Sequence, residues 1–143
     1  MTEIRLIGKT LVFNEKGELL VLQRAAWKER PEIAHTPDFP GGRADDDETE
    51  RETAVREIEE EIGVTVSERD LRVAYTGSVM IEKEDTIVNR ILFMVYLDYT
   101  PEIKLSAEHE SYKWIDPKEA VKTEKFVGFY AEALEFVVKN GII

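Results

Sequence analysis

Apolar residues in the first part of the chain are arranged as in β-strands. Residues Ile4–Phe13 alternate enough between apolar and polar side chains to indicate a strand. The turn residues Asn14–Gly17 follow, and the apolar run within Glu18–Gln23 predicts a second strand. Because the connection is so short, we expect the two strands to form a hairpin.

A loop and a helix are predicted next. Ala25–Pro40 contains three prolines and no clear periodicity, which predicts a long loop. After Gly41 and Gly42, the segment Glu48–Ile62 is predicted to be a helix that ends at Gly63. Long loops inside compact domains are often functional, so Ala25–Pro40 is a candidate for substrate contacts.

The second half of the chain predicts more strands and a final helix. Strands are expected at Leu71–Val79, Ile87–Tyr99 and Tyr112–Ile115. Apolar residues at helical spacing predict an amphipathic helix over Phe126–Lys139. Strands mixed with two well-separated helices predict an α/β or α+β sandwich with a mixed sheet, and we expect residues 1–143 to form a single domain.

Composition narrows the class of protein. No run of 18 or more apolar residues is present, so no membrane span is expected. The first residues lack the layout of a signal peptide, and the absence of cysteine excludes disulfides and thiolate metal sites. We therefore expect a cytoplasmic protein that does not bind membranes.

The acidic residues are unevenly distributed. The net charge of −11 disfavours direct binding to DNA or long RNA. The segment Gly42–Gly63 holds ten acidic residues and three basic ones, whereas the rest of the chain holds 20 acidic and 16 basic residues. Either a divalent cation needs this charge or the segment is a solvated acidic helix, and composition alone favours the second reading.

The positions of the acidic residues around the helix bear on whether this segment binds a cation or is a solvated acidic helix. At 100° per residue, Ala54, Ile58 and their apolar neighbours cluster on one arc, which predicts a core-facing side. The carboxylates of Glu57, Glu60 and Glu61 cluster on the adjacent arc, at spacings that bring them within reach of one another. Three carboxylates on one face provide the oxygen ligands that Mg²⁺ or Mn²⁺ needs, although a solvated face has the same pattern.

The spacing of these residues resembles a known motif. The chain has Gly42, five residues, Glu48, seven residues, Arg56-Glu57-Ile58, one residue, Glu60-Glu61, one residue and Gly63-Val64. This matches the Nudix box, G-x5-E-x7-R-E-U-x-E-E-x-G-U with U aliphatic, at every defined position. The flanking residues Leu19–Arg24 and Phe39–Gly42 resemble the strand and glycine turn that precede the box in this family. The resemblance implies a Nudix-type α/β/α sandwich with a central mixed sheet.

The resemblance also implies roles for the residues of the box. The implied metal ligands are the carbonyl of Gly42 and the carboxylates of Glu57, Glu60 and Glu61. Arg56 matches an arginine that orients a neighbouring carboxylate; otherwise it forms a surface ion pair of little energetic value. Glycine at 41 and 42 lets the backbone approach the metal and the phosphates. Glu48 is equally compatible with a catalytic role and with a structural one at the positive end of the helix dipole.

A fourth catalytic carboxylate is expected from outside the helix. Glu108 lies six residues before Trp114 and resembles the family pattern of a loop acid ahead of a Trp-containing strand. Such a group could bind a cation or deprotonate the attacking water. Glu110 is the second choice, and a solvated loop glutamate is the alternative for both.

Substrate-binding residues are expected around the loop. Arg24, and after it Lys28 and Arg30, are scarce positive charges that could hold phosphates. Three aromatic residues could stack on a base, although aromatics are more often core residues: Trp27, Phe39 and Phe129. We expect the two histidines, His35 and His109, to be surface or hydrogen-bonded residues and not ligands, because this site needs oxygen donors.

The implied activity is Mg²⁺-dependent hydrolysis of a phosphoanhydride bond, with Mn²⁺ as an alternative ion. We expect a small nucleotide substrate, such as a nucleoside triphosphate or a nucleotide sugar, in which a nucleoside diphosphate is linked to another group. The alternative is a catalytically silent Nudix fold that binds a nucleotide, yet all three helix carboxylates are present. Isoprenoid diphosphate isomerisation would need a cysteine, and the chain has none. The oligomeric state stays open, with a homodimer among the alternatives.

Overall fold

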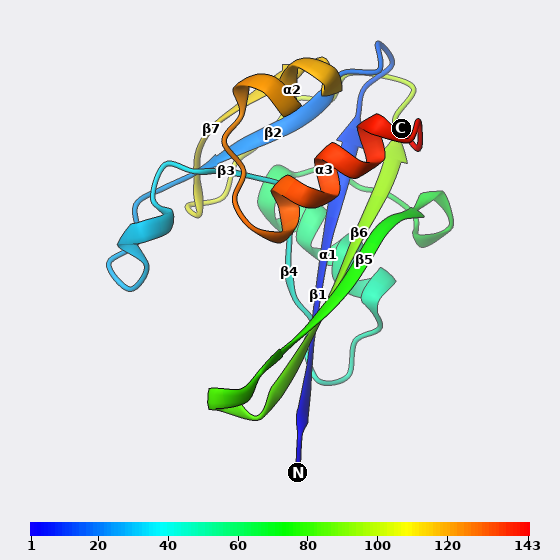
Figure 1. Cartoon of the computed structure of the whole chain (residues 1–143). Coiled ribbons are helices and arrows are strands. Elements are labelled where there is room, and N and C mark those ends of the chain that lie inside the picture. The colour runs from blue at the N-terminus through cyan, green and yellow to red at the C-terminus, as the bar shows by residue number, and fades with distance from the viewer.

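The computed structural model describes residues 1–143 as three layers, with helices on both faces of one mixed sheet (Figure 1). The helices are α1 (Glu50–Ile62), α2 (Pro117–Thr123) and α3 (Phe129–Lys139). Helix α1 covers one face, and α2 and α3 cover the other. The predicted α/β/α sandwich is therefore confirmed.

The sheet has seven strands, two of which pair outside the main path. They are β1 (Glu3–Phe13), β2 (Leu19–Arg24), β3 (Pro37–Asp38), β4 (Gly41–Arg43), β5 (Arg72–Ile81), β6 (Thr86–Tyr96) and β7 (His109–Ile115). The order is β3-β2-β1-β6-β5, while β4 pairs with β1 and β7 pairs with β2. Only β1 and β6 are parallel, so the sheet is mixed as predicted.

Alternation along the central strands builds a core on each face. Val12 and Leu20 pack with α1 in a cluster of 12 buried residues, whereas Leu11 and Leu19 pack with α3 in a cluster of 11. Successive side chains of a strand point to opposite faces, which explains why neighbouring residues serve different cores. Burying both faces in this way fixes the register of β1.

The first hairpin is confirmed only at its turn. Asn14 Oδ1 accepts hydrogen bonds from the N–H groups of Lys16 and Glu18, both at 3.0 Å. Beyond Phe13 and Leu19, β1 and β2 have no further paired residues. Instead, β1 pairs with β4 and β2 pairs with β3 and β7.

Helix α1 begins two residues later than predicted, at Glu50. Thr49 is its N-cap and forms a capping box with Glu52, since each side chain accepts a hydrogen bond from the other residue's backbone N–H. This reciprocal pair satisfies free donors at the helix start and fixes the boundary there. The predicted end is confirmed: Gly63 is the left-handed C-cap.

Several elements of the prediction need correction. Helix α2 and the short strands β3 and β4 were not predicted, and β7 begins at His109. The strand β6 ends at Tyr96, three residues before the predicted Tyr99, and β5 continues to Ile81. Helix α3 begins at Phe129, because Gly128 has a positive φ of 59° that helical backbone does not adopt.

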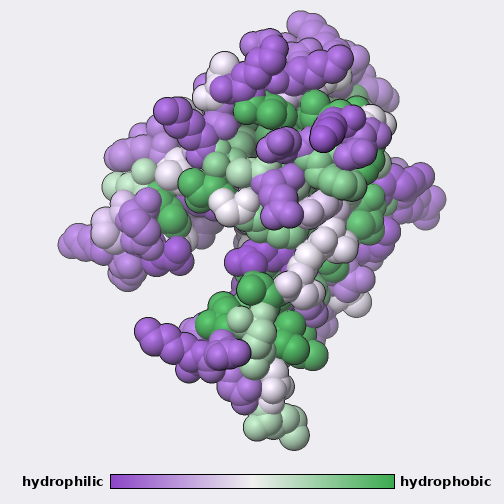
Figure 2. All heavy atoms as spheres, in the orientation of Figure 1, coloured by the Kyte–Doolittle hydropathy of each residue, from purple (hydrophilic) through white to green (hydrophobic).

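The β5–β6 hairpin extends beyond the body of the molecule, next to the N-terminal end of β1 (Figure 1). Apolar side chains are visible on it in Figure 2, and Val79 and Met80 are exposed. None of the helices combines the length and apolar composition that crossing a bilayer requires.

Candidate functional site

The carboxylates of the acidic helix differ in their surroundings. Ala54, Ile58 and Ile62 are fully buried, so this side of α1 packs on the sheet as predicted. Glu61 is buried beside them, Glu57 is partly buried and Glu60 is exposed. The three predicted ligands therefore run from the core edge to solvent along one helix.

The glycine turn at β4 is packed tightly against β1. Gly41 has a φ of 149°, and a Cβ there would lie 2.3 Å from the carbonyl oxygen of Gly8 and 2.4 Å from Cα of Lys9. Its N–H donates to Glu61 Oε1 at 3.2 Å. Only glycine can occupy this position without a backbone shift, and the turn supplies Glu61 with a backbone donor.

The next residue brings backbone close to a second carboxylate. A Cβ at Gly42 would lie 3.0 Å from Glu57 Oε1. The absence of a side chain thus leaves room for the Glu57 carboxylate against the strand. The backbone of Gly42 and the carboxylate of Glu57 are therefore neighbours in the structure.

Arg56 holds the exposed side of the cluster in place. Its Nε and Nη2 donate to the two oxygens of Glu48 at 2.6 and 2.9 Å. Its Nη1 donates to Glu57 Oε1 at 2.9 Å and to Glu60 Oε2 at 3.1 Å. The guanidinium therefore orients two helix carboxylates, which agrees with the expectation for Arg56.

Glu48 is placed differently from the prediction. It precedes the N-cap Thr49 and does not belong to the first turn of α1. The hydrogen bond from Arg56 lowers the pKa of Glu48 to about 2. The helix dipole is therefore not its main partner: Glu48 is an ionised anchor for Arg56.

The buried carboxylate of Glu61 is electrostatically unbalanced. Burial raises the pKa of Glu61 well above its ordinary value, and the negative charges of Asp38 and Glu57 raise it further. The charge of Lys9 and the Gly41 N–H oppose this effect without overcoming it. An additional positive charge next to Glu61 would favour its ionised form.

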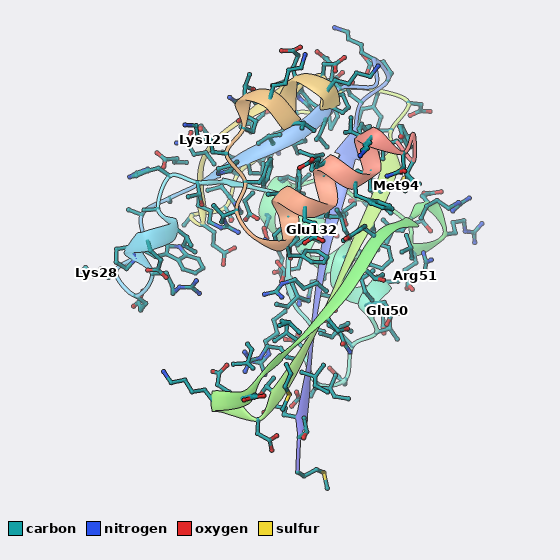
Figure 3. All side chains as sticks on the ribbon, in the orientation of Figure 1. Lys28, Glu50, Arg51, Met94, Lys125 and Glu132 are labelled. Atoms are coloured by element: carbon teal, nitrogen blue, oxygen red, sulfur yellow. The ribbon has the colours of Figure 1, made fainter.

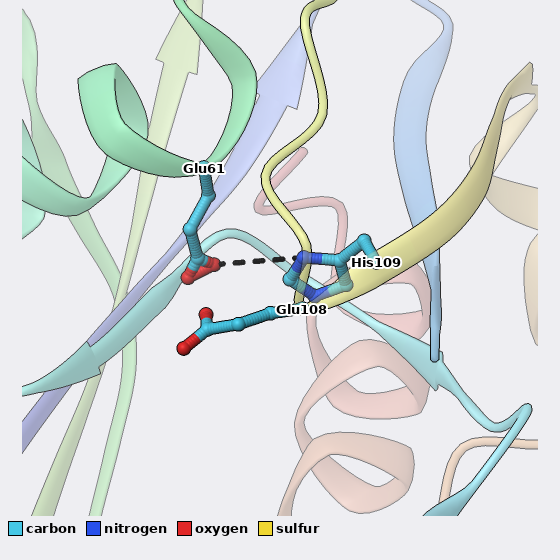
Figure 4. Close-up of side chains that lie close together, drawn as sticks. All are labelled: Glu61, Glu108 and His109. Atoms are coloured by element: carbon cyan, nitrogen blue, oxygen red, sulfur yellow. Dashed lines mark ion pairs between the residues drawn. The ribbon is translucent and has the colours of Figure 1, made fainter. Parts of the chain in front are cut away.

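The loop before β7 brings Glu108 to the helix. The N–H of Ser106 donates to the carbonyl of Glu61 at 3.1 Å, and the N–H of Ala25 donates to that of Glu108 at 2.9 Å. Glu61, Glu108 and His109 each offer one ligand atom, and these atoms lie within 4.8 Å of one another (Figure 4). Glu110 instead pairs with His35 on the surface.

A buried charged network continues from this cluster. His109 Nε2 lies 2.9 Å from Asp38 Oδ2, and Lys9 Nζ donates to Asp38 Oδ1 at 2.6 Å. Burial alone would raise the pKa of Asp38, yet the charge of Lys9 and the hydrogen bond from His109 outweigh it and lower the pKa to about 2. Sequence reasoning missed Lys9 and Asp38, although a lone lysine inside a predicted strand is a signal that could have marked the first.

A cavity of about 340 Å³ lies beside the network. Its charged lining residues are all basic: Lys9, Arg24, Arg30 and Arg90. Lys9 links it to the carboxylates, because its strand pairs with Gly41. The guanidinium of Arg90 lies 5.8 Å from the ring centre of Phe129, and Lys9 Nζ lies 5.5 Å from that of Tyr130. Cations and aromatic rings in one cavity can bind phosphates and a base.

The structure places only some of the predicted substrate-binding residues in the cavity. Arg24, Arg30 and Phe129 line the cavity, and Arg24 also donates to Asp38 at 2.9 Å. Phe39 is a correction: its side chain is fully buried and stacks on Phe126 at 4.5 Å, so its ring packs in the core and offers no face to a base. Lys28 points outward from the tip of the loop (Figure 3), and neither Lys28 nor Trp27 lines the cavity.

Comparison with known families gives one match over most of the chain. The model of the NUDIX domain matches residues 9–136, which include the glycine turn, α1 and the loop that carries Glu108. A crystal structure of the MutT protein from Methanosarcina mazei Go1 superposes with a TM-score of 0.81 at 26% identity, covering 98% of this chain and 96% of that one.

Several curated relatives have names that describe an activity. The mouse (Mus musculus) bis(5'-nucleosyl)-tetraphosphatase [asymmetrical] is 32% identical over 90 residues, which are 61% of this chain and 60% of the mouse protein. The CTP pyrophosphohydrolase of Escherichia coli (strain K12) is 27% identical over 114 residues, 78% of this chain and 76% of the relative. The match thus spans less than two thirds of the mouse protein's length.

Proposed function

Because this chain belongs to the Nudix family, we propose that it hydrolyses a phosphoanhydride bond of a small nucleotide with the help of a divalent cation. The observation that carries this proposal is that Glu61 lies close to Glu108 and is within reach of the charges of Glu57 and of Lys9, which lines the basic cavity. The carboxylates suit a cation, and the cavity suits the phosphates that the reaction cleaves.

The residues present fit a divalent cation. Glu61 is a buried carboxylate with a raised pKa, and one backbone N–H is the only donor that hydrogen-bonds to it. A Cβ at residue 42 would occupy the space next to Glu57. Carboxylate oxygens are the preferred ligands of Mg²⁺ and Mn²⁺, so Glu57, Glu60, Glu61, Glu108 and the carbonyl of Gly42 would hold the ion.

Each protein group then has a task in the reaction. A bound divalent cation polarises the phosphoryl oxygens and lowers the pKa of water. Arg56 keeps Glu57 and Glu60 in position, since its guanidinium donates to both. Glu108 provides a fourth carboxylate from outside the helix, where it can accept the proton of the attacking water.

The cavity supports a small nucleotide with several phosphates. Four basic residues and no acidic ones line it, in a chain whose net charge is −11. A basic cavity in a chain that is acidic as a whole suits a small anion, whereas the net negative charge disfavours the body of an RNA. The names of the mouse and E. coli relatives point to dinucleoside tetraphosphates and nucleoside triphosphates as the first substrates to test.

Chelation of the cation is expected to abolish hydrolysis. Cleavage products are separated by anion-exchange chromatography after incubation with Mg²⁺ and dinucleoside tetraphosphates, nucleoside triphosphates including CTP, nucleotide sugars, ADP-ribose or a capped RNA. EDTA should stop turnover of the best substrate, and added Mg²⁺ should restore it, because the carboxylates act through the ion. Full activity in EDTA, or turnover of the capped RNA alone, would contradict the proposal.

Removing one basic residue of the cavity is expected to weaken substrate binding. Arg90 lines the cavity and has no ion pair, so its charge is available for a phosphate. Arg90→Gln should raise KM about tenfold with little change in kcat, as for a lost charge-assisted hydrogen bond. Lys28→Gln is the matched control, since it removes an equal charge outside the cavity. Equal KM changes in both variants would show that only long-range charge matters.

A further inference from the structure

We propose that His109 is a nitrogen ligand of the cation held by Glu61 and Glu108, so that this position selects a first-row transition ion over Mg²⁺. The inference rests on the proposed function for the presence of the ion, and adds a ligand that the Nudix box does not contain. It replaces the expectation from the sequence that His109 is not a ligand.

The first observation is a buried nitrogen without a partner. The side chain of His109 is 2% exposed, and its Nδ1 has no hydrogen-bond partner. In Figure 4 this atom faces the carboxylate of Glu61, and the distance to Glu61 Oε2 is 4.0 Å. That distance is too long for a hydrogen bond, so the two groups face each other across a gap. Buried polar atoms are rarely left unpaired, and an ion between them would satisfy both.

The second observation is how the ring is held. Asp38 is fixed by Lys9 and Arg24 at 2.6 and 2.9 Å, so it is an ionised acceptor. It can only accept a hydrogen bond from His109, at 2.9 Å, and the proton of that bond is therefore on Nε2. In the neutral ring this leaves the Nδ1 lone pair directed at Glu61. Metal-bound histidines are commonly oriented by a carboxylate in this way.

The separation of the ligand atoms fits one ion. Ligand bonds of about 2.1 Å place neighbouring and opposite donors of one octahedral ion roughly 3.0 to 4.2 Å apart. The 4.0 Å between Glu61 and His109 falls in this range. All three donor atoms lie within 4.8 Å, and Glu108 is exposed, so its side chain is free to move inward.

The donor set determines the kind of ion. Carboxylates alone suit Mg²⁺ and Mn²⁺ equally, whereas an imidazole nitrogen favours first-row transition ions. Adding one imidazole to the carboxylates therefore favours Mn²⁺ over Mg²⁺. A buried water in the gap is the competing arrangement, since a water could also satisfy Nδ1.

Mn²⁺ binding to the intact chain tests this directly. Free Mn²⁺ is followed by EPR during titration of metal-free protein, and bound Mn²⁺ is examined by pulsed EPR for coupling to an imidazole nitrogen. The chain has only two histidines, so His35→Gln is a matched control. His35 is exposed and pairs with Glu110. We expect imidazole coupling in the wild type and in His35→Gln, and its loss in His109→Gln. Loss of the ligand should weaken Mn²⁺ binding about tenfold or more, with a much smaller change for Mg²⁺.

The outcomes separate this inference from the proposed function. Bound Mn²⁺ without imidazole coupling in the wild type would overturn the inference and assign the gap to water. Failure of Mn²⁺ to bind at millimolar concentration would overturn it as well. The wild type and His35→Gln decide the question even if His109→Gln does not fold. The proposed function is decided independently by hydrolysis with and without EDTA.

Discussion

Replacing Glu61 with glutamine is expected to lower kcat by at least about 10²-fold, a loss of about 2.7 kcal/mol of transition-state stabilisation. Glu61 is the buried member of the carboxylate cluster, and it faces Glu108 and His109. Glutamine keeps the shape but removes the charge that would bind the cation. Glu60→Gln is expected to lower kcat by the same order, because Glu60 completes the three carboxylates of the box.

Folding should not suffer in the Glu61 variant. The raised pKa of this carboxyl reflects burial and the nearby charges of Asp38 and Glu57, so its charge is a cost to the fold. Thermal unfolding should therefore give an equal or higher Tm for Glu61→Gln. Steady-state kinetics of Glu59→Gln provide the control, since Glu59 lies on the same helix but faces solvent. Wild-type kcat in the Glu60 and Glu61 variants would instead show that these carboxylates take no part in hydrolysis.

Gly41→Ala is expected to lower the free energy of unfolding by about 3 kcal/mol or more. A Cβ at this position would lie 2.3 Å from the carbonyl oxygen of Gly8, and the φ of 149° is one that alanine avoids. Both effects push β4 away from β1 and would also displace the N–H that donates to Glu61. Unfolding in urea measures the loss, and the total stability of small domains makes it a large fraction.

A second glycine separates strain from steric overlap. Gly17 has a φ of 75°, but a Cβ there would meet nothing within 4 Å. Gly17→Ala therefore carries only the backbone strain, about 1 to 2 kcal/mol. Equal losses in the two variants would mean that the contact between β4 and β1 relaxes without cost, and would contradict the prediction for Gly41.

The local pattern of apolar, polar and turn residues predicted those features that depend only on residues close together in the sequence. The end of β1 at Phe13, the end of α1 at Gly63 and the apolar face of α1 follow from neighbouring residues alone. The errors lie where long-range contact decides. The two-residue strand β3 and the three-residue strand β4 are too short to show a period, and exist because β2 and β1 pair with them. That the chain is one domain stays a prediction.

The candidate site likewise has features that the sequence predicts and features that depend on tertiary packing. The spacing of Glu57, Glu60 and Glu61 is enough to identify the acidic face, because residues three and four apart share one side of a helix. Their different burial could not be predicted, since it depends on how the glycine turn and the loop before β7 pack against α1. The location of Phe39 could not be predicted from the sequence either. Its aromatic side chain lies in the core because it packs against Phe126.

The sequence by itself determined the family motif, the acidic helix and the layered fold, because these depend on spacing within one segment or on a recurring apolar pattern. Tertiary structure alone decided that Lys9, Asp38 and His109 form one network with Glu61. The pairs Lys9–Asp38 and Asp38–His109 are 29 and 71 residues apart in sequence. No local period relates residues at such separations, and they meet because β1 aligns with β4 while the loop before β7 folds back onto α1. The negative charge of the helix could therefore be predicted from its own residues. The groups that surround the Glu61 carboxylate come from other parts of the chain.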